Sequence, residues 1–168
     1  TPVAEAAFLD LPTAPPRVVA SDATLDYLTF GPDGDLSAFG AVVDSTEGVT
    51  LTGSAELSLA IGYALADPGR TATGGFDLFD ADGLVLDGEL ARVGFSESLV
   101  TALEPGVLEF EFVNLGGPAA STFGPSVLMT VAFADPIGPN VFANLVDGTA
   151  YDASLTVAHV VPLPGAAL

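Results

Sequence analysis

The sequence lacks cysteine, lysine and tryptophan, and it contains one histidine and three arginines. Without cysteine, neither a disulfide nor a thiolate metal site can form. Without lysine, no Schiff base can form, and without tryptophan only three tyrosines remain as polar aromatics to stack on sugar rings. A run of about 18 apolar residues is also missing, so we expect no membrane-spanning helix.

Positive charge is the scarcest property of the chain. Against 22 Asp and Glu, the few arginines leave a formal net charge of −19 at pH 7. Such a chain repels phosphate backbones and anionic lipid, which argues against binding nucleic acid or a membrane surface by charge. Copies of the chain also repel one another unless salt or divalent cations screen them.

The composition is nevertheless that of a folded protein. Hydrophobic residues make up 49% of the 168 residues and the mean hydropathy is +0.56, unlike a disordered acidic tail. Short apolar runs recur at intervals of about 8–12 residues with Gly and Pro between them, which predicts one antiparallel β-sandwich or jelly roll over residues 17–161, with little helix. The expected strands are Thr24–Phe30, Leu36–Val43, Gly48–Thr52, Ser54–Ile61, Gly75–Asp80, Leu84–Leu90, Val107–Val113, Ser126–Ala134 and Tyr151–Val161. The helix candidates are Pro2–Leu11 and Ser96–Leu103.

Side-chain alternation and turn residues refine this prediction. In Val107–Val113, Leu108, Phe110 and Phe112 share one face, which we expect to lie in the core. Asp82-Gly83 between two apolar runs predicts a tight hairpin, and a second turn is expected in the segment from Gly31 to Asp35.

The first 16 residues form a separate unit in this interpretation. Val3, Phe8, Leu9 and Leu11 are apolar and need burial, and the Pro-rich stretch from Pro12 to Pro16 predicts a stiff, extended tether. The segment either packs on its own domain or reaches a neighbouring copy as an added strand. A short helix beginning at Pro2 is a further alternative.

The C-terminal end carries a motif. Val161-Pro162-Leu163-Pro164, followed by small apolar residues, resembles the VPLP-type variant of the PEP-CTERM sorting signal of bacterial surface proteins. The resemblance implies export by a Gram-negative bacterium, processing by an exosortase-type protease and a place in surface or matrix material. It covers residues 162–168 and the preceding valine, and the hydrophobic segment and basic tail of that signal are missing. The alternative is a last strand that ends because proline cannot continue a ladder. The opening Thr1-Pro2-Val3 is also what signal-peptide removal would leave.

Aspartates gather around the predicted hairpin. Asp77, Asp80 and Asp82 lie within six residues, and Asp87 follows in the next run. Ca²⁺ takes six to eight oxygen ligands, and Asp-x-Asp-Gly occurs in many Ca²⁺ loops, so these four residues are the candidate metal ligands. We expect only weak binding, and a solvated hairpin turn in an acidic protein is the more ordinary interpretation.

Catalytic groups are few. His159 lies among valines and alanine, which indicates a strand residue rather than a base, and no Gly-x-Ser-x-Gly elbow is present. Glu109 and Glu111 are about 7 Å apart along one strand face, a spacing that could suit an inverting glycosidase. Alternating glutamates on a solvent face are ordinary, so we expect no catalytic residues.

These observations predict a non-enzymatic, secreted surface protein. The first hypothesis is a structural subunit of an extracellular layer, matrix or filament that assembles with other copies through its N-terminal segment. The alternative is a Ca²⁺-assisted polysaccharide-binding module that uses the Asp77–Asp82 hairpin.

Overall fold

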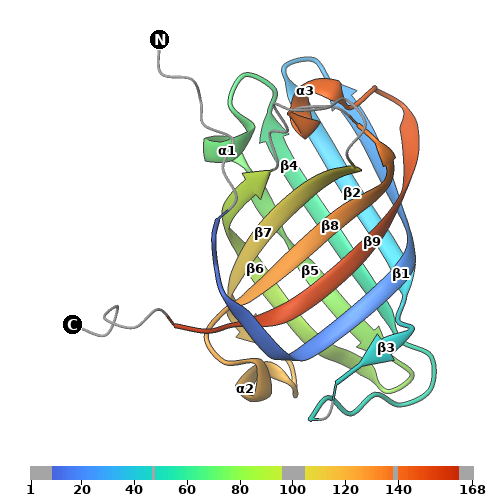
Figure 1. The fold of residues 1–168 in the computed structure, drawn as a ribbon, viewed down its shortest axis with the longest axis vertical. Helices are drawn as coiled ribbons and strands as arrows, with labels where there is room; N and C mark the ends of the chain where they lie inside the picture. The colour runs from blue at the N-terminus through green and yellow to red at the C-terminus, as the bar shows by residue number, and fades with distance from the viewer. Residues whose placement is uncertain (1–8, 47, 96–104, 138–139, 163–168) are drawn as a thin grey trace.

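The computed structural model describes residues 9–46, 48–95, 105–137 and 140–162 as a β-protein with three single-turn helices in those ranges (Figure 1). The strands are β1 (Thr13–Phe30), β2 (Asp33–Ala41), β3 (Asp44–Ser45), β4 (Glu56–Ala64), β5 (Thr73–Asp80), β6 (Gly83–Phe95), β7 (Pro105–Gly116), β8 (Val127–Pro136) and β9 (Thr149–Val160). The helices are α1 (Pro68–Thr71), α2 (Ala120–Phe123) and α3 (Val141–Asn144).

The sheet closes into a barrel of eight antiparallel strands. The order of neighbouring strands in the sheet is β2-β4-β5-β6-β7-β8-β9-β1, and β1 pairs with β2 to complete the ring. The short strand β3 pairs with Val18 and Val19 in the N-terminal part of β1. The prediction of an all-β antiparallel domain is confirmed, but the sandwich or jelly roll is wrong. Alternation and tight turns are the same in both architectures, and only the long-range pairing of β1 with β9 distinguishes them.

Side chains fill the interior of the barrel. Leu108, Phe110 and Phe112 point inward from β7 and are fully buried, as the alternation predicts. The Phe76 ring on β5 lies 4.7 Å from that of Phe112, centroid to centroid. Because inward positions are apolar and the intervening positions carry most of the carboxylates, the wall separates a dry core from a charged exterior.

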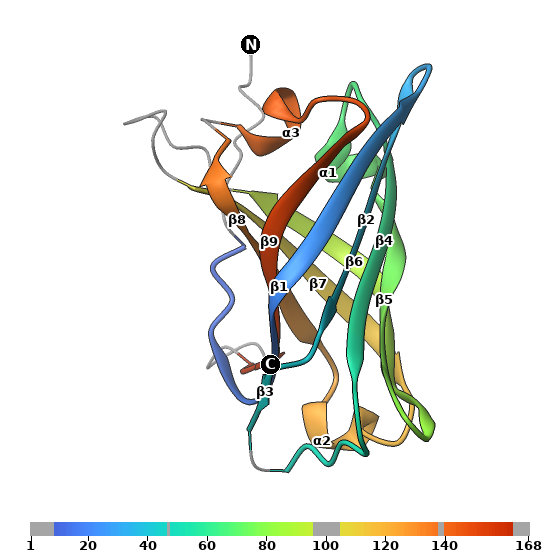
Figure 2. The same ribbon diagram turned by 90° about the vertical axis from the view of Figure 1, so that its right-hand side faces the viewer.

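A one-turn helix closes each end of the barrel (Figures 1 and 2). At the lower end, near the β5–β6 turn, α2 inserts Phe123, which is completely buried. At the upper end, near the β1–β2 turn, α3 inserts Val141 and Phe142. The Phe142 ring contacts those of Tyr63 and Phe95 edge to face, at centroid distances of 5.0 and 5.1 Å.

The proline-rich stretch is part of the barrel rather than a free tether from Thr13 onward. Thr13 and Ala14 pair with Val160 and His159 of β9, and after a bulge the pairing resumes at Arg17. The unit boundary expected at residue 16 therefore falls inside β1. Prolines are tolerated here because the bulge takes them out of the ladder.

The remaining sequence predictions have mixed outcomes. Both hairpins are confirmed, since Phe30 pairs with Asp33 and Asp80 with Gly83. Gly48–Thr52 is not a strand but part of the loop between β3 and β4. The helix candidate Ser96–Leu103 lies outside the described residues, as does most of Pro2–Leu11, whose last three residues are not helical. No helix in the described ranges has the length and apolar composition needed to cross a bilayer.

Candidate functional site

The four aspartates proposed as metal ligands divide into two pairs. Asp77 and Asp87 are direct cross-strand partners on β5 and β6 and line a shallow hollow with Glu89 and Asn114. Burial and the neighbouring Asp87 carboxylate raise the pKa of Asp77. The Glu89 carboxylate accepts a hydrogen bond of 3.0 Å from the Asn114 amide. The pair is therefore a point of like-charge repulsion on the outer wall.

Asp80 and Asp82 lie at the β5–β6 turn. The Asp80 carboxylate accepts the backbone N–H of Thr52 at 2.8 Å through one oxygen and that of Asp82 at 2.8 Å through the other. These donors lower the pKa of Asp80. Asp80 thus ties the β3–β4 loop to the hairpin turn, a structural task that its sequence pattern does not reveal.

No three His, Asp or Glu side chains in the described part of the chain are gathered in a way that would hold a metal ion. Weak Ca²⁺ binding at the turn stays a prediction.

A hollow at the lower end lies beside the turn of Asp80 and Asp82. Its volume is about 350 Å³, and hydroxyl, carboxylate and apolar groups share its lining. The lining residues are Gly48, Thr50, Thr52, Asp80, Asp82, Leu84, Val85, Pro118, Ala119 and Thr122. Hydroxyls and carboxylates beside a small apolar surface are chemically suited to a neutral, hydroxyl-rich ligand.

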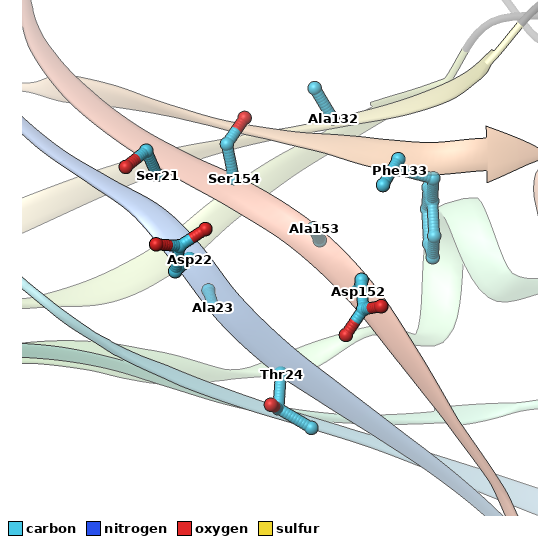
Figure 3. A pocket seen from close by; sticks show the side chains of 10 residues that line it. Ser21, Asp22, Ala23, Thr24, Ala132, Phe133, Asp152, Ala153 and Ser154 are labelled. Carbon is cyan, nitrogen blue, oxygen red and sulfur yellow. The ribbon is translucent and has the colours of Figure 1, made fainter.

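A larger hollow lies on the outer wall where β1 bulges (Figure 3). Ala20 pairs with Leu155 and Ala23 with Ala153, so Ser21 and Asp22 together oppose one residue, Ser154. The hollow measures about 610 Å³. Asp22, Asp152 and the hydroxyls of Ser21, Thr24 and Ser154 line it together with apolar residues of β1, β8 and β9. The apolar lining residues are Ala23, Ala132, Phe133, Ala134 and Ala153. The sequence contains an indication of this bulge. Alternate residues of β1 are buried (Val18, Ala20, Ala23 and Leu25), and Ser21 and Asp22 insert one extra residue into that alternation.

Glu109 is the acceptor for the N-terminal segment. Its Oε2 accepts the backbone N–H of Leu9 at 2.9 Å, and both Leu9 and Leu11 are half-buried. Burial raises the pKa of Glu109, the Leu9 N–H opposes this rise, and the Asp10 carboxylate adds to it. Further along, the Val161 N–H donates to the Pro12 carbonyl at 2.9 Å. The described end of the segment therefore packs on its own barrel, while Val3 and Phe8 lie outside the described residues.

Glu111 has a different partner from Glu109. Arg92 on β6 donates to both of its carboxylate oxygens, at 3.2 Å from Nε and 2.8 Å from Nη2. This bidentate pair raises the pKa of Arg92. The two glutamates are thus held by separate groups, one by a backbone amide and one by a guanidinium, an arrangement better suited to structure than to shared acid–base work.

His159 lies in β9, the strand position expected for it. Its Nδ1 lies 2.6 Å from the Phe123 carbonyl, so Nδ1–H is the donor in this contact. The histidine thereby fixes α2 to the barrel wall. Val161 and Pro162 of the sorting motif follow β9 directly and are exposed, and Leu163 and Pro164 lie outside the described residues.

Comparisons of the chain with protein-family models, with curated proteins and with solved structures find no match.

Proposed function

We propose that the protein is a non-enzymatic, secreted surface protein: a structural subunit of an extracellular layer, matrix or filament that assembles through its N-terminal segment. The observation that carries the proposal is the hydrogen bond from the Leu9 N–H to the Glu109 carboxylate on the outer wall of β7. It identifies an acceptor for this segment outside the closed core. The barrel does not need the segment to complete its ring of strands.

An outer acceptor of this kind can be filled by the chain's own segment or by that of a neighbour. Residues 9–12 run along the outside of the barrel before β1 begins, as the blue trace on the left of Figure 1 shows. Exchange of such a segment between copies conserves every contact and needs only a change of connectivity. Because each copy carries a net charge of −19, assembly should require salt or Ca²⁺ to screen the surfaces.

The proposed location is the surface of a Gram-negative bacterium. The resemblance of the segment beginning at Val161-Pro162 to a VPLP-type sorting signal supports it. Both residues are exposed directly after the last strand, where a processing enzyme could reach them.

The test compares the full chain with a variant that lacks residues 1–11. The cut precedes Pro12, because Pro12 bonds with Val161 and Thr13 begins β1. Light scattering and electron microscopy, in chelator and then in millimolar Ca²⁺, should show assembly of the full chain and a folded monomer for the variant. Unchanged assembly of the shortened chain, or a monomeric full chain in both solutions, would sink the proposal.

A matched pair of point variants examines the acceptor itself. Glu109→Gln keeps a carbonyl oxygen for the Leu9 N–H, whereas Glu109→Ala removes the acceptor. We expect the Gln variant to assemble like the parent and the Ala variant to assemble poorly. If the two variants assemble equally well, the hydrogen bond between Leu9 and Glu109 does not contribute to self-association.

A second candidate is a Ca²⁺-assisted polysaccharide-binding module. The lower hollow favours it, because Thr50, Thr52 and Thr122 place hydroxyls beside Asp82 and a small apolar surface. Glycan-array binding should be lost in Asp82→Ala and kept in Asp77→Ala, since Asp77 lies outside this hollow. If no glycan on the array binds, either in chelator or in millimolar Ca²⁺, the candidate is excluded.

A further inference from the structure

The β1–β2 hairpin projects beyond the upper end of the barrel (Figure 2). Leu28 and Phe30 lie two residues apart on the outward face of β1, with 45% and 59% of their surfaces exposed. Val146, in the loop before β9, is 61% exposed. These three side chains are called the hairpin patch below.

Hydrogen bonds hold the Val146 loop against the same end of β1. The Thr29 N–H donates to the Asp147 carboxylate at 2.7 Å, and the Gly148 N–H donates to the Tyr27 carbonyl at 2.9 Å. Val146 is therefore a fixed neighbour of the hairpin. Single exposed apolar side chains are common on proteins, but two on a projecting hairpin with a third on a loop bonded to the same strand are typical of an interaction surface.

Carboxylates surround the hairpin patch. Asp33 is the cross-strand partner of Phe30, and Asp35 is the partner of Leu28. Asp26 precedes Leu28 on the same face of β1, and Asp147 follows Val146. All four aspartates are exposed, so the apolar side chains stand within a ring of negative charge.

None of the three arginines lies in the β1–β2 hairpin or in the loop of Val146, although α1, which carries Arg70, is at the same upper end of the barrel (Figure 1). Arg17 is at the opposite end of β1, Arg92 is paired with Glu111 on β6 and β7, and Arg70 is in α1 next to Asp67 at 3.9 Å. A second copy would therefore set carboxylates against the carboxylates of the hairpin patch, and an anionic lipid surface would be repelled in the same way. Charge complementarity selects a cationic occupant.

We propose that the hairpin patch is a docking surface for a basic amphipathic segment of another protein. Apolar side chains of the partner cover Leu28, Phe30 and Val146, while its lysines or arginines pair with the surrounding aspartates. The surface is independent of the N-terminal segment, because Glu109 lies on β7, away from β1 and β2 in the ring of strands.

The spacing on β1 suits a helical partner. Two residues along a strand place Leu28 and Phe30 about 7 Å apart. On a helix, residues i and i+4 are about 6 Å apart along the axis, so one apolar stripe meets both side chains. The residues beside such a stripe then reach the strand positions that carry Asp33 and Asp35.

The test uses the full chain and two synthetic peptides of equal charge. One is an amphipathic Lys/Leu helix, and in the other serine replaces each leucine. Fluorescence anisotropy should give an affinity for the Lys/Leu peptide about tenfold or more above that for the Lys/Ser peptide. Equal affinities would show attraction to the net charge alone and would overturn the proposal.

Matched variants locate the binding. Leu28→Ser with Phe30→Ser removes apolar surface at the hairpin patch, and Phe39→Ser with Phe79→Ser removes exposed aromatic surface elsewhere, both at constant charge. The first pair should weaken Lys/Leu binding about tenfold and the second less than about twofold. Equal losses in the two pairs would overturn the proposal.

A second comparison, between two pairs of Asp→Asn variants, tests the same docking surface if the serine variant fails to fold. Asp33→Asn with Asp35→Asn should weaken the Lys/Leu peptide several-fold more than Asp22→Asn with Asp152→Asn, which removes the same charge at the β1 bulge. A larger loss from the bulge pair would place the site there instead. Self-association or vesicle binding abolished by the serine pair would also contradict a basic protein partner.

Discussion

The two ends of the barrel are closed by similar one-turn helices, yet they differ in how completely their buried polar groups are hydrogen-bonded. At the lower end, Phe123 is fully buried, its carbonyl accepts from His159, and Asp80 accepts two backbone N–H groups. At the upper end, the buried Tyr63 hydroxyl makes no hydrogen bond of normal geometry among the described residues, and the Tyr27 side chain is a polar neighbour. Exposed apolar side chains occur at both ends, in the hairpin patch at the upper end and at Phe79 beside the β5–β6 turn at the lower end.

This difference indicates that the two ends contribute differently to stability and to interactions. A closure with paired polar groups and a fully buried aromatic contributes stability. A closure that leaves a buried hydroxyl without a well-formed hydrogen bond costs stability, and natural proteins tolerate such costs mostly where function needs them. We therefore expect the lower end to anchor the fold and the upper end to carry interactions.

The largest expected effect comes from removing the two aromatic plugs. Phe123→Ala should lower the free energy of unfolding by about 3–5 kcal/mol, because it leaves a cavity lined by rigid wall. Phe142→Ala should cost less, about 2–3 kcal/mol, because that ring is 8% exposed and lies at the rim. Urea unfolding of both variants gives the comparison. A larger loss at Phe142 would reverse the assignment of the anchoring end.

A smaller effect of opposite sign is expected at Tyr63. Tyr63→Phe removes a buried hydroxyl that makes no hydrogen bond of normal geometry, even to neighbouring Tyr27, and should stabilise the protein by about 1 kcal/mol. Burial raises the pKa of this phenol, and neighbouring Tyr27 and Asp35 add to the rise, so its neutral form is the one present. Thermal and urea unfolding measure the change.

The control for this prediction is Tyr151→Phe. The Tyr151 hydroxyl oxygen accepts the Val146 N–H at 2.8 Å, so its removal should cost about 1 kcal/mol. Destabilisation by both variants would mean that the Tyr63 hydroxyl has a partner in solution.

The strands of the wall could be predicted because local alternation determines them. Leu108, Phe110 and Phe112 follow the period of two, and the Asp-Gly turn sits where the register requires it. Barrel closure could not be predicted in this way. It depends on the pairing of β1 with β9, whose partners lie far apart in the sequence, and both architectures satisfy the same alternation.

The candidate site was harder to predict than the fold. Proximity in sequence suggested that Asp77, Asp80, Asp82 and Asp87 act together, but the hairpin separates the wall pair from the turn pair. The proline-rich stretch looked like a tether because prolines disfavour strands, yet a bulge accommodates them in β1. Leu9 and Glu109 are 100 residues apart, and no local pattern connects them.

The smallest effect concerns the Asp80 turn of the lower end and depends on pH. Backbone N–H donors from Thr52 and Asp82 lower the folded-state pKa of Asp80 below its ordinary value of 3.8. The stabilisation is therefore complete above the unfolded-state pKa and is lost as the pH falls through the folded-state pKa. Asp80→Asn keeps one acceptor oxygen, so it should be less stable than the parent at neutral pH and approach it in acid. Urea unfolding along a pH series tests this, with Asp82→Asn as the control that removes the same charge from the same turn. If both variants change stability equally at every pH, relief of net charge governs the turn, and the lower end owes its stability to Phe123 rather than to Asp80.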